Sequence, residues 1–117
     1  MTNQVLQIKT NNKLKLLEIK EDEGFLKLLQ KAVGGYVEHV QMSAHLSFYI
    51  NEEGTIHGMP PNFGASFLFT NDPKNAGVDL LIFGNAVLCT HGPQGEVVGL
   101  PEVVIEEVYR MFRQEMP

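Results

Sequence analysis

The chain has 117 residues, of which 44% are hydrophobic and 20% are charged, as is typical of one globular domain, so we expect a single domain over residues 1–117. Its net charge of −5 disfavours non-specific binding to nucleic acid, because a phosphate backbone would be repelled. The single cysteine permits no intrachain disulfide, and no segment has the pattern of a signal peptide or a membrane span. We therefore expect a soluble cytoplasmic protein that does not associate with membranes.

The first third of the chain predicts a hairpin and a helix. Alternating apolar residues indicate two short strands, at residues 5–8 and 14–19, joined by a turn. The acidic run at residues 21–23 suits the start of a helix, and apolar residues recur at helical spacing over residues 25–33. Two glycines at residues 34–35 are expected to end this helix.

A second hairpin is predicted next, with strands at residues 36–42 and 45–51 and a two-residue turn at Ser43-Ala44. Such a turn fixes the register, because every residue then faces a defined partner. One surface would place Tyr36 opposite Asn51 and Glu38 opposite Tyr49. The other surface would face the core and is formed by Val37, His39, Leu46, Phe48 and Ile50.

The rest of the chain predicts further strands and a final helix. Residues 63–69 are consistent with a short helix or a buried strand, of which we prefer the helix. Residues 70–77 are rich in turn formers and are expected to be exposed and mobile. Residues 78–90 predict two strand pieces or one bulged strand, and an apolar stripe predicts a helix that starts at Pro101. We expect an α+β fold with a single mixed, largely antiparallel sheet, one helix near the middle and one C-terminal helix.

The most distinctive segment is the loop from Asn51 to Asn62, which combines two glycines and two prolines with polar ends. Turn formation and a helix cap at Asn62 are the simpler explanation of these residue types. The functional alternative is a recognition loop that forms one wall of a pocket beside the polar face of the hairpin. The candidate ligand-binding residues are Tyr36, Glu38, Tyr49, Asn51, Glu52, Gly54, His57, Gly58, Pro60, Pro61 and Asn62.

The sequence contains no recognisable catalytic or metal-binding motif. Its four histidines lack the close spacing that identifies a zinc site; they are His39, His45, His57 and His91. Cys89 lies in an apolar, strand-like run and is expected to be an unreactive core residue. Nucleophile elbows, phosphate-binding loops and dinucleotide-binding glycine patterns are also missing from the sequence. We therefore assign no catalytic residue, no metal and no cofactor.

Four motifs in chain order resemble those of domain of unknown function family 3846. They are Val33-Gly34-Gly35-Tyr36-Val37-Glu38, Asn51-Glu52-Glu53-Gly54, Gly58-Met59-Pro60-Pro61-Asn62-Phe63-Gly64-Ala65 and Phe83-Gly84-Asn85-Ala86-Val87-Leu88. The resemblance runs from the first helix onward, and the segment from Asn71 to Gly77 departs from it. It implies a small protein of bacteriophages, plasmids and their bacterial hosts, and it implies no activity.

Three hypotheses of function follow from these observations. The leading one is a non-enzymatic accessory protein of a phage or mobile element that binds a host defence protein or sequesters a nucleotide-like small molecule. The second is a small hydrolase that uses Glu38 or Glu52 as a base together with His57. The third is a structural subunit, a homo-oligomer assembled through the C-terminal helix or a sheet edge.

Overall fold

The computed structural model describes residues 2–20 and 24–116, and it has a central antiparallel sheet. Five strands form the sheet in the order β2 (Leu14–Glu18), β1 (Gln4–Ile8), β7 (Ala86–His91), β4 (Leu46–Asn51) and β3 (Val37–Gln41). A short strand, β8 (Val97–Val98), also pairs with β7. Two further short strands, β5 (Pro61–Asn62) and β6 (Ile82–Phe83), pair with each other in a separate ribbon.

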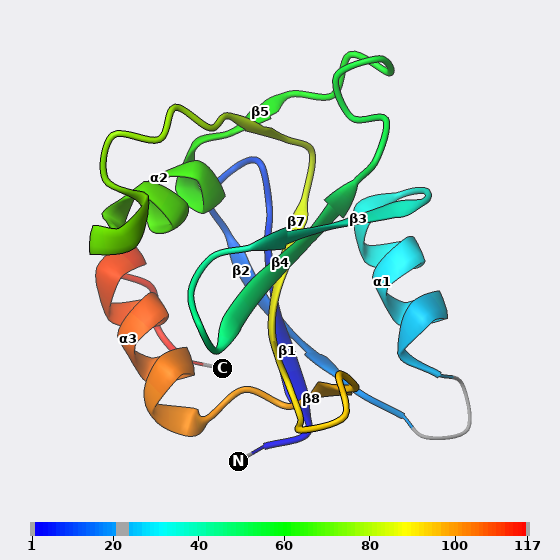
Figure 1. The fold of residues 1–117 in the computed structure, drawn as a ribbon, viewed down its shortest axis with the longest axis vertical. Coiled ribbons are helices and arrows are strands. Elements are labelled where there is room, and N and C mark those ends of the chain that lie inside the picture. Colours follow the sequence, from blue (N-terminus) through cyan, green and yellow to red (C-terminus); the bar gives the residue numbers. More distant parts are fainter. Residues whose placement is uncertain (1, 21–23, 117) are drawn as a thin grey trace.

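Helices cover both faces of this sheet (Figure 1). Helix α1 (Phe25–Val33) lies on one side, and helices α2 (Phe63–Asn71) and α3 (Glu102–Phe112) lie on the other. A one-turn helix, η1 (Pro73–Asn75), follows α2. The sheet thus separates two hydrophobic cores. None of the helices among the described residues is long and apolar enough to cross a membrane.

The two cores follow from the alternation of side chains along the central strands, since neighbouring residues of a strand point to opposite faces. On β7, Val87 and Cys89 pack in the core under α1, whereas Leu88 packs in the core under α2 and α3. On β1, Val5 and Leu6 divide in the same way. Strands β1 and β7 are therefore buried on both faces. The flanking strands β2 and β4 are positioned by pairing with them.

The α+β class, the antiparallel sheet and the C-terminal helix are as the sequence predicts. The ambiguous segment after the loop is a helix, α2, which Asn62 caps by accepting a hydrogen bond from the amide of Ala65 at 3.0 Å. The segment at 78–90 contains two separate strands, β6 and β7, which join different sheets. The predicted bulged alternative is therefore excluded, and the sheet is accompanied by a second small ribbon.

Helix α1 ends as the paired glycines predict. Gly34 has a φ of 79°, in the left-handed region that suits glycine, and its amide donates to the carbonyl of Gln30 at 2.9 Å. The predicted acidic start at residues 21–23 lies outside the described residues. Helix α3 begins at Glu102, directly after Pro101, and its buried side chains are Ile105, Val108 and Tyr109.

The predicted register of the second hairpin is wrong by one residue. Val37 lies opposite Asn51, and His39 lies opposite Tyr49. The cause is the turn, since the amides of Met42 and Ser43 both donate to the carbonyl of Leu46 at 3.0 Å and leave three residues, not two, at the bend. A shift of one residue moves every side chain of a strand to the other face relative to its partner. Tyr49 therefore shares a face with His39 and not with Glu38.

Candidate functional site

The residues predicted to bind a ligand do not form one site. Asn51 and Tyr49 lie on the face of the sheet that α1 partly covers, opposite Val37 and His39. Glu38 pairs with Ile50, a residue that packs against the core under α2 and α3, and so belongs to the other face. Tyr36 precedes β3 and is 69% exposed. The predicted polar face of the hairpin is therefore divided between two sides of the sheet.

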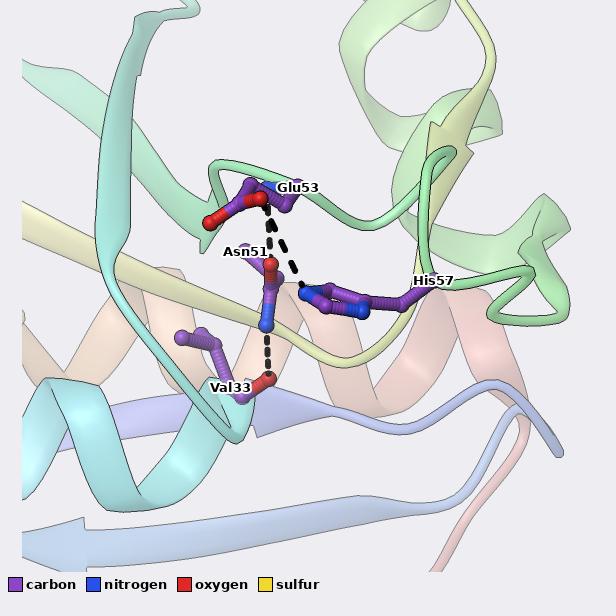
Figure 2. A network of polar contacts seen from close by, with 4 residues as sticks. All are labelled: Val33, Asn51, Glu53 and His57. Carbon is purple, nitrogen blue, oxygen red and sulfur yellow. Dashed lines mark hydrogen bonds and ion pairs between the residues drawn. The ribbon is translucent and has the colours of Figure 1, made fainter.

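Asn51 is a structural residue rather than a free ligand-binding group. Its side-chain amide donates to the carbonyl of Val33 at 3.1 Å, and its side-chain oxygen accepts from the amide of Glu53 at 2.8 Å. Figure 2 shows this side chain between the end of α1 and the start of the loop. Because Asn51 is buried and both ends of its amide are bonded, it ties the loop to α1.

Asn62, at the other end of the loop, is tied in the same manner. It is fully buried, and its side-chain amide donates to the carbonyls of Ile8 at 2.8 Å and Gly84 at 3.0 Å. Its oxygen is the cap of α2 described above. The simpler prediction, that the loop ends serve turns and a cap, describes both asparagines correctly.

The middle of the loop consists of successive turns. Amides of His57, Gly58 and Met59 donate to carbonyls three to five residues earlier. In the described part of the chain, the carboxylate that reaches His57 is that of Glu53, at 3.9 Å, rather than that of Glu38 or Glu52 (Figure 2). Both partners are largely exposed, so this contact is a surface ion pair of small energetic effect. The geometry gives no support to the hydrolase hypothesis.

The glycines and prolines of the loop determine the path of its backbone. They are Gly54, Gly58, Pro60 and Pro61. The amide of Gly54 donates to the carbonyl of Asn51 at 3.2 Å, and a β-carbon at Gly54 would lie 2.8 Å from the carbonyl oxygen of Phe83. Gly58 has a φ of 66°, which favours glycine. The carbonyl of Pro60 accepts from the amide of Gly84 at 2.8 Å, beside the short ribbon that Pro61 begins. These contacts fix the path of the loop backbone.

A different group of polar side chains converges on the α1 side of the sheet, beyond the part that the helix covers. Three rings, those of His39 on β3, Tyr49 on β4 and His91 on β7, stand with centroids 5.4 to 5.9 Å apart and tilted planes. The hydroxyl oxygen of Tyr49 lies 2.9 Å from Nε2 of His91. They line an open groove of about 680 Å³, which we call the histidine groove. Its other lining residues are Gln41, Ala44, His45, Gly92 and Pro93.

A chain of hydrogen bonds orients His39. The side-chain amide nitrogen of Gln41 donates to the backbone carbonyl of Ser43. The oxygen of the same side chain, Oε1, accepts a hydrogen bond from the hydroxyl of Ser47 at 3.1 Å. The hydroxyl oxygen of Ser47 then accepts from Nε2 of His39 at 2.8 Å. His39 therefore carries its proton on Nε2, and in the neutral ring Nδ1 is an acceptor.

Burial and neighbouring charge set the protonation of the rings. Burial lowers the pKa of His91, the proximity of His39 lowers it further, and Glu96 acts in the opposite direction. Burial also raises the pKa of Tyr49, with a smaller contribution from Cys89, so its hydroxyl keeps its proton. At neutral pH the Tyr49 and His91 pair is thus uncharged and can both donate and accept hydrogen bonds.

Ser47 and Cys89 lie opposite each other beside the rings and are fully buried. The complete burial of Cys89 confirms the predicted core position, and burial raises the pKa of its thiol to about 12. Across the described residues, no group of three or more His, Cys, Asp or Glu side chains is arranged to hold a metal ion. The histidine groove therefore presents aromatic faces and hydrogen-bonding atoms, whereas the hydroxyl of Ser47 and the thiol of Cys89 beside it are buried.

Only Tyr49 of this groove was among the predicted site residues. The predicted register turns His39 towards the core, and His91 falls just beyond the strand segment predicted at residues 78–90. The signal that could have identified them is the pairing of β4 with β7, which brings Tyr49 and His91 onto the same face. That pairing joins segments about forty residues apart, so local patterns do not reveal it.

Comparison with known proteins places the chain in one family. The sequence profile described as "Domain of unknown function (DUF3846)" matches residues 1–113. The match includes the motifs of the resemblance noted above, and it extends to the N-terminal strands β1 and β2, which the resemblance did not cover. No curated protein and no solved structure matches the chain.

Proposed function

The chain belongs to the DUF3846 family, and we propose that it is a non-enzymatic binding protein whose histidine groove takes a small, flat, nucleotide-like ligand. The expected setting is the cytoplasm of a bacterium that carries a phage or plasmid. There the protein would act by lowering the free concentration of its ligand, for example a nucleotide signal of host defence. Binding of a host defence protein is the alternative that a flat response in the test below would leave open.

The observation that carries the proposal is the cluster of three rings at the groove. Aromatic and imidazole rings with centroids 5.4 to 5.9 Å apart offer faces on which a planar ligand can stack. The groove volume, about 680 Å³, lies within the range of small-ligand sites. The nitrogen and oxygen atoms of His39, Tyr49 and His91 could read the hydrogen-bonding edge of such a ligand.

Burial of the neighbouring nucleophiles favours binding over covalent catalysis. Ser47 and Cys89 lie beside the ring cluster, and both are fully buried. The Cys89 thiol, with a pKa of about 12, is not a thiolate near neutral pH. Ser47 already shares its hydroxyl between His39 and Gln41. A ligand in the groove would therefore meet aromatic rings and fixed hydrogen bonds.

Isothermal titration calorimetry against a panel of ribonucleosides and nucleoside monophosphates tests the proposal. We expect binding by the native protein and at least about tenfold weaker binding by the His39→Ala variant, since one stacking and hydrogen-bonding partner is lost. His57→Ala is the matched control, because His57 is an exposed histidine on the loop, away from the groove lining. A flat response across the panel would overturn the small-ligand proposal. An equal loss in both variants would show that the groove is not the site.

A further inference from the structure

Three histidines line the histidine groove, and its lining contains neither Asp nor Glu in the part of the chain that the structure describes. The imidazoles are those of His39, His45 and His91. This concentration is notable because the protein as a whole carries a net charge of −5. The lining gathers imidazoles, and the carboxylate of Glu96, which acts on His91, lies just outside it beside Gly92. Such a lining is suited to an anion, because imidazoles can donate hydrogen bonds and can become positively charged.

The hydrogen bonds of two of these rings show how an anion would be held. Nε2 of His39 donates to Ser47, and Nε2 of His91 is bonded to the hydroxyl of Tyr49. In both rings Nδ1 is therefore the nitrogen left for a ligand. In neutral His39 this Nδ1 bears no proton and would face an anion as a second acceptor. While Ser47 donates to Gln41, His39 needs a second proton before it can donate from Nδ1.

From this geometry we propose that the ligand carries a phosphate beside its flat ring, that His39, His45 and His91 bind the phosphate, and that binding is coupled to proton uptake. The inference rests on the proposed function and names the charged part of the ligand. The proton comes from solvent and stays on the imidazoles while the phosphate is bound, and no bond of the ligand is broken. The histidine groove is then selective for nucleotides over nucleosides.

The other groups near these imidazoles are consistent with this coupling. Tyr49 and the buried Cys89 keep their protons, since burial raises the pKa of each. Glu96 reaches back over Gly92, where a β-carbon would collide with its carboxylate, and its charge favours the protonated form of His91. Burial and His39 keep the pKa of free His91 below its usual value, so an incoming anion would drive proton binding near neutral pH.

The test compares a nucleoside with its monophosphate by calorimetry at about pH 6 and about pH 8, the range in which histidine titrates. Near pH 6 we expect the monophosphate to bind about tenfold more tightly than near pH 8, and the nucleoside to bind equally at both, because only the former is linked to protons. Titrations near pH 7 in two buffers of different ionisation enthalpy then measure the net proton uptake, which includes any change in the protonation of the phosphate, whose second pKa is about 6.

The variants His39→Gln and His45→Gln should each remove most of the preference for the monophosphate, and His57→Gln serves as the control. If the nucleoside and its monophosphate bind equally and no proton is taken up, the inference fails while the proposed function stands. If neither binds, both fail. Circular dichroism of each variant confirms that it is folded before its binding is interpreted. A variant that does not fold is replaced by the asparagine substitution at the same position.

Discussion

A β-carbon at Gly35 would lie 2.8 Å from the side-chain nitrogen of Asn51, closer than two such atoms can approach. Gly35 therefore lets the chain after α1 pass directly against the amide that ties the loop in place. We expect Gly35→Ala to lower the free energy of unfolding by about 2 kcal/mol, as overpacking of a buried contact does. Urea denaturation measures the change.

The double variant Gly35→Ala with Asn51→Ala provides the control for this contact. Asn51→Ala alone should also cost about 2 kcal/mol, because a backbone carbonyl and a backbone amide lose their partners. If a β-carbon at position 35 clashes with Asn51, the Gly35→Ala substitution should lower the free energy of unfolding much less in the Asn51→Ala variant than in the native protein. Strictly additive costs would show that Gly35 acts on something other than Asn51.

Asn62 caps α2 and also donates two hydrogen bonds, and the substitution Asn62→Asp separates these two roles. Asn62→Asp keeps an oxygen for the amide of Ala65 but turns a second oxygen towards the carbonyls of Ile8 and Gly84. We expect it to destabilise the fold by about 3 kcal/mol, since a buried charge would face two acceptors. A simple cap tolerates aspartate as well as asparagine. Thermal and urea denaturation showing an Asp variant as stable as the native protein would contradict the donor role.

The thiol of Cys89 should be inert in the folded protein. Its pKa of about 12 and its complete burial leave neither thiolate nor access at about pH 8. A colorimetric thiol reagent should therefore react with the native protein only as fast as the protein unfolds, and within minutes after addition of denaturant. Rapid reaction without denaturant would mean that the sheet opens at β7.

Stability should fall on acidification in a way that depends on His91. The folded-state pKa of His91 is lowered, so below the unfolded value of about 6.5 the unfolded chain holds more protons than the folded one. Between that pH and the lower folded pKa, the contribution of His91 to stability declines as pH decreases. Urea denaturation from about pH 8 to pH 5 should show a weaker pH dependence for His91→Gln than for the native protein.

Most of the helices and strands could be predicted, because the residues that define each of them lie close together in the sequence. The paired glycines after Val33, the cap at Asn62 and the apolar residues of β1 each act within a few residues. Helix α2 was ambiguous because apolar residues occur all around it, with Phe67 exposed and Phe69 buried. The predicted register of the second hairpin was wrong for one reason, the length of its turn.

The histidine groove could not be predicted, since its three rings come from three strands. The reversed face of His39 followed from the turn at Ser43, and the position of His91 followed from the pairing of β4 with β7. Neither can be read from the spacing of histidines along the chain. Conversely, the loop that attracted attention by its glycines and prolines proved to be held by two buried asparagines.

The strand that carries His91, β7, lies in the middle of the sheet, and its residues from Ala86 to Thr90 are buried between the two cores. A wall of the histidine groove is therefore built on one of the parts of the protein that open last, where amide hydrogens exchange most slowly. For the proposed ligand, the wall formed by β7 is in place before binding, so little affinity is lost to ordering this strand.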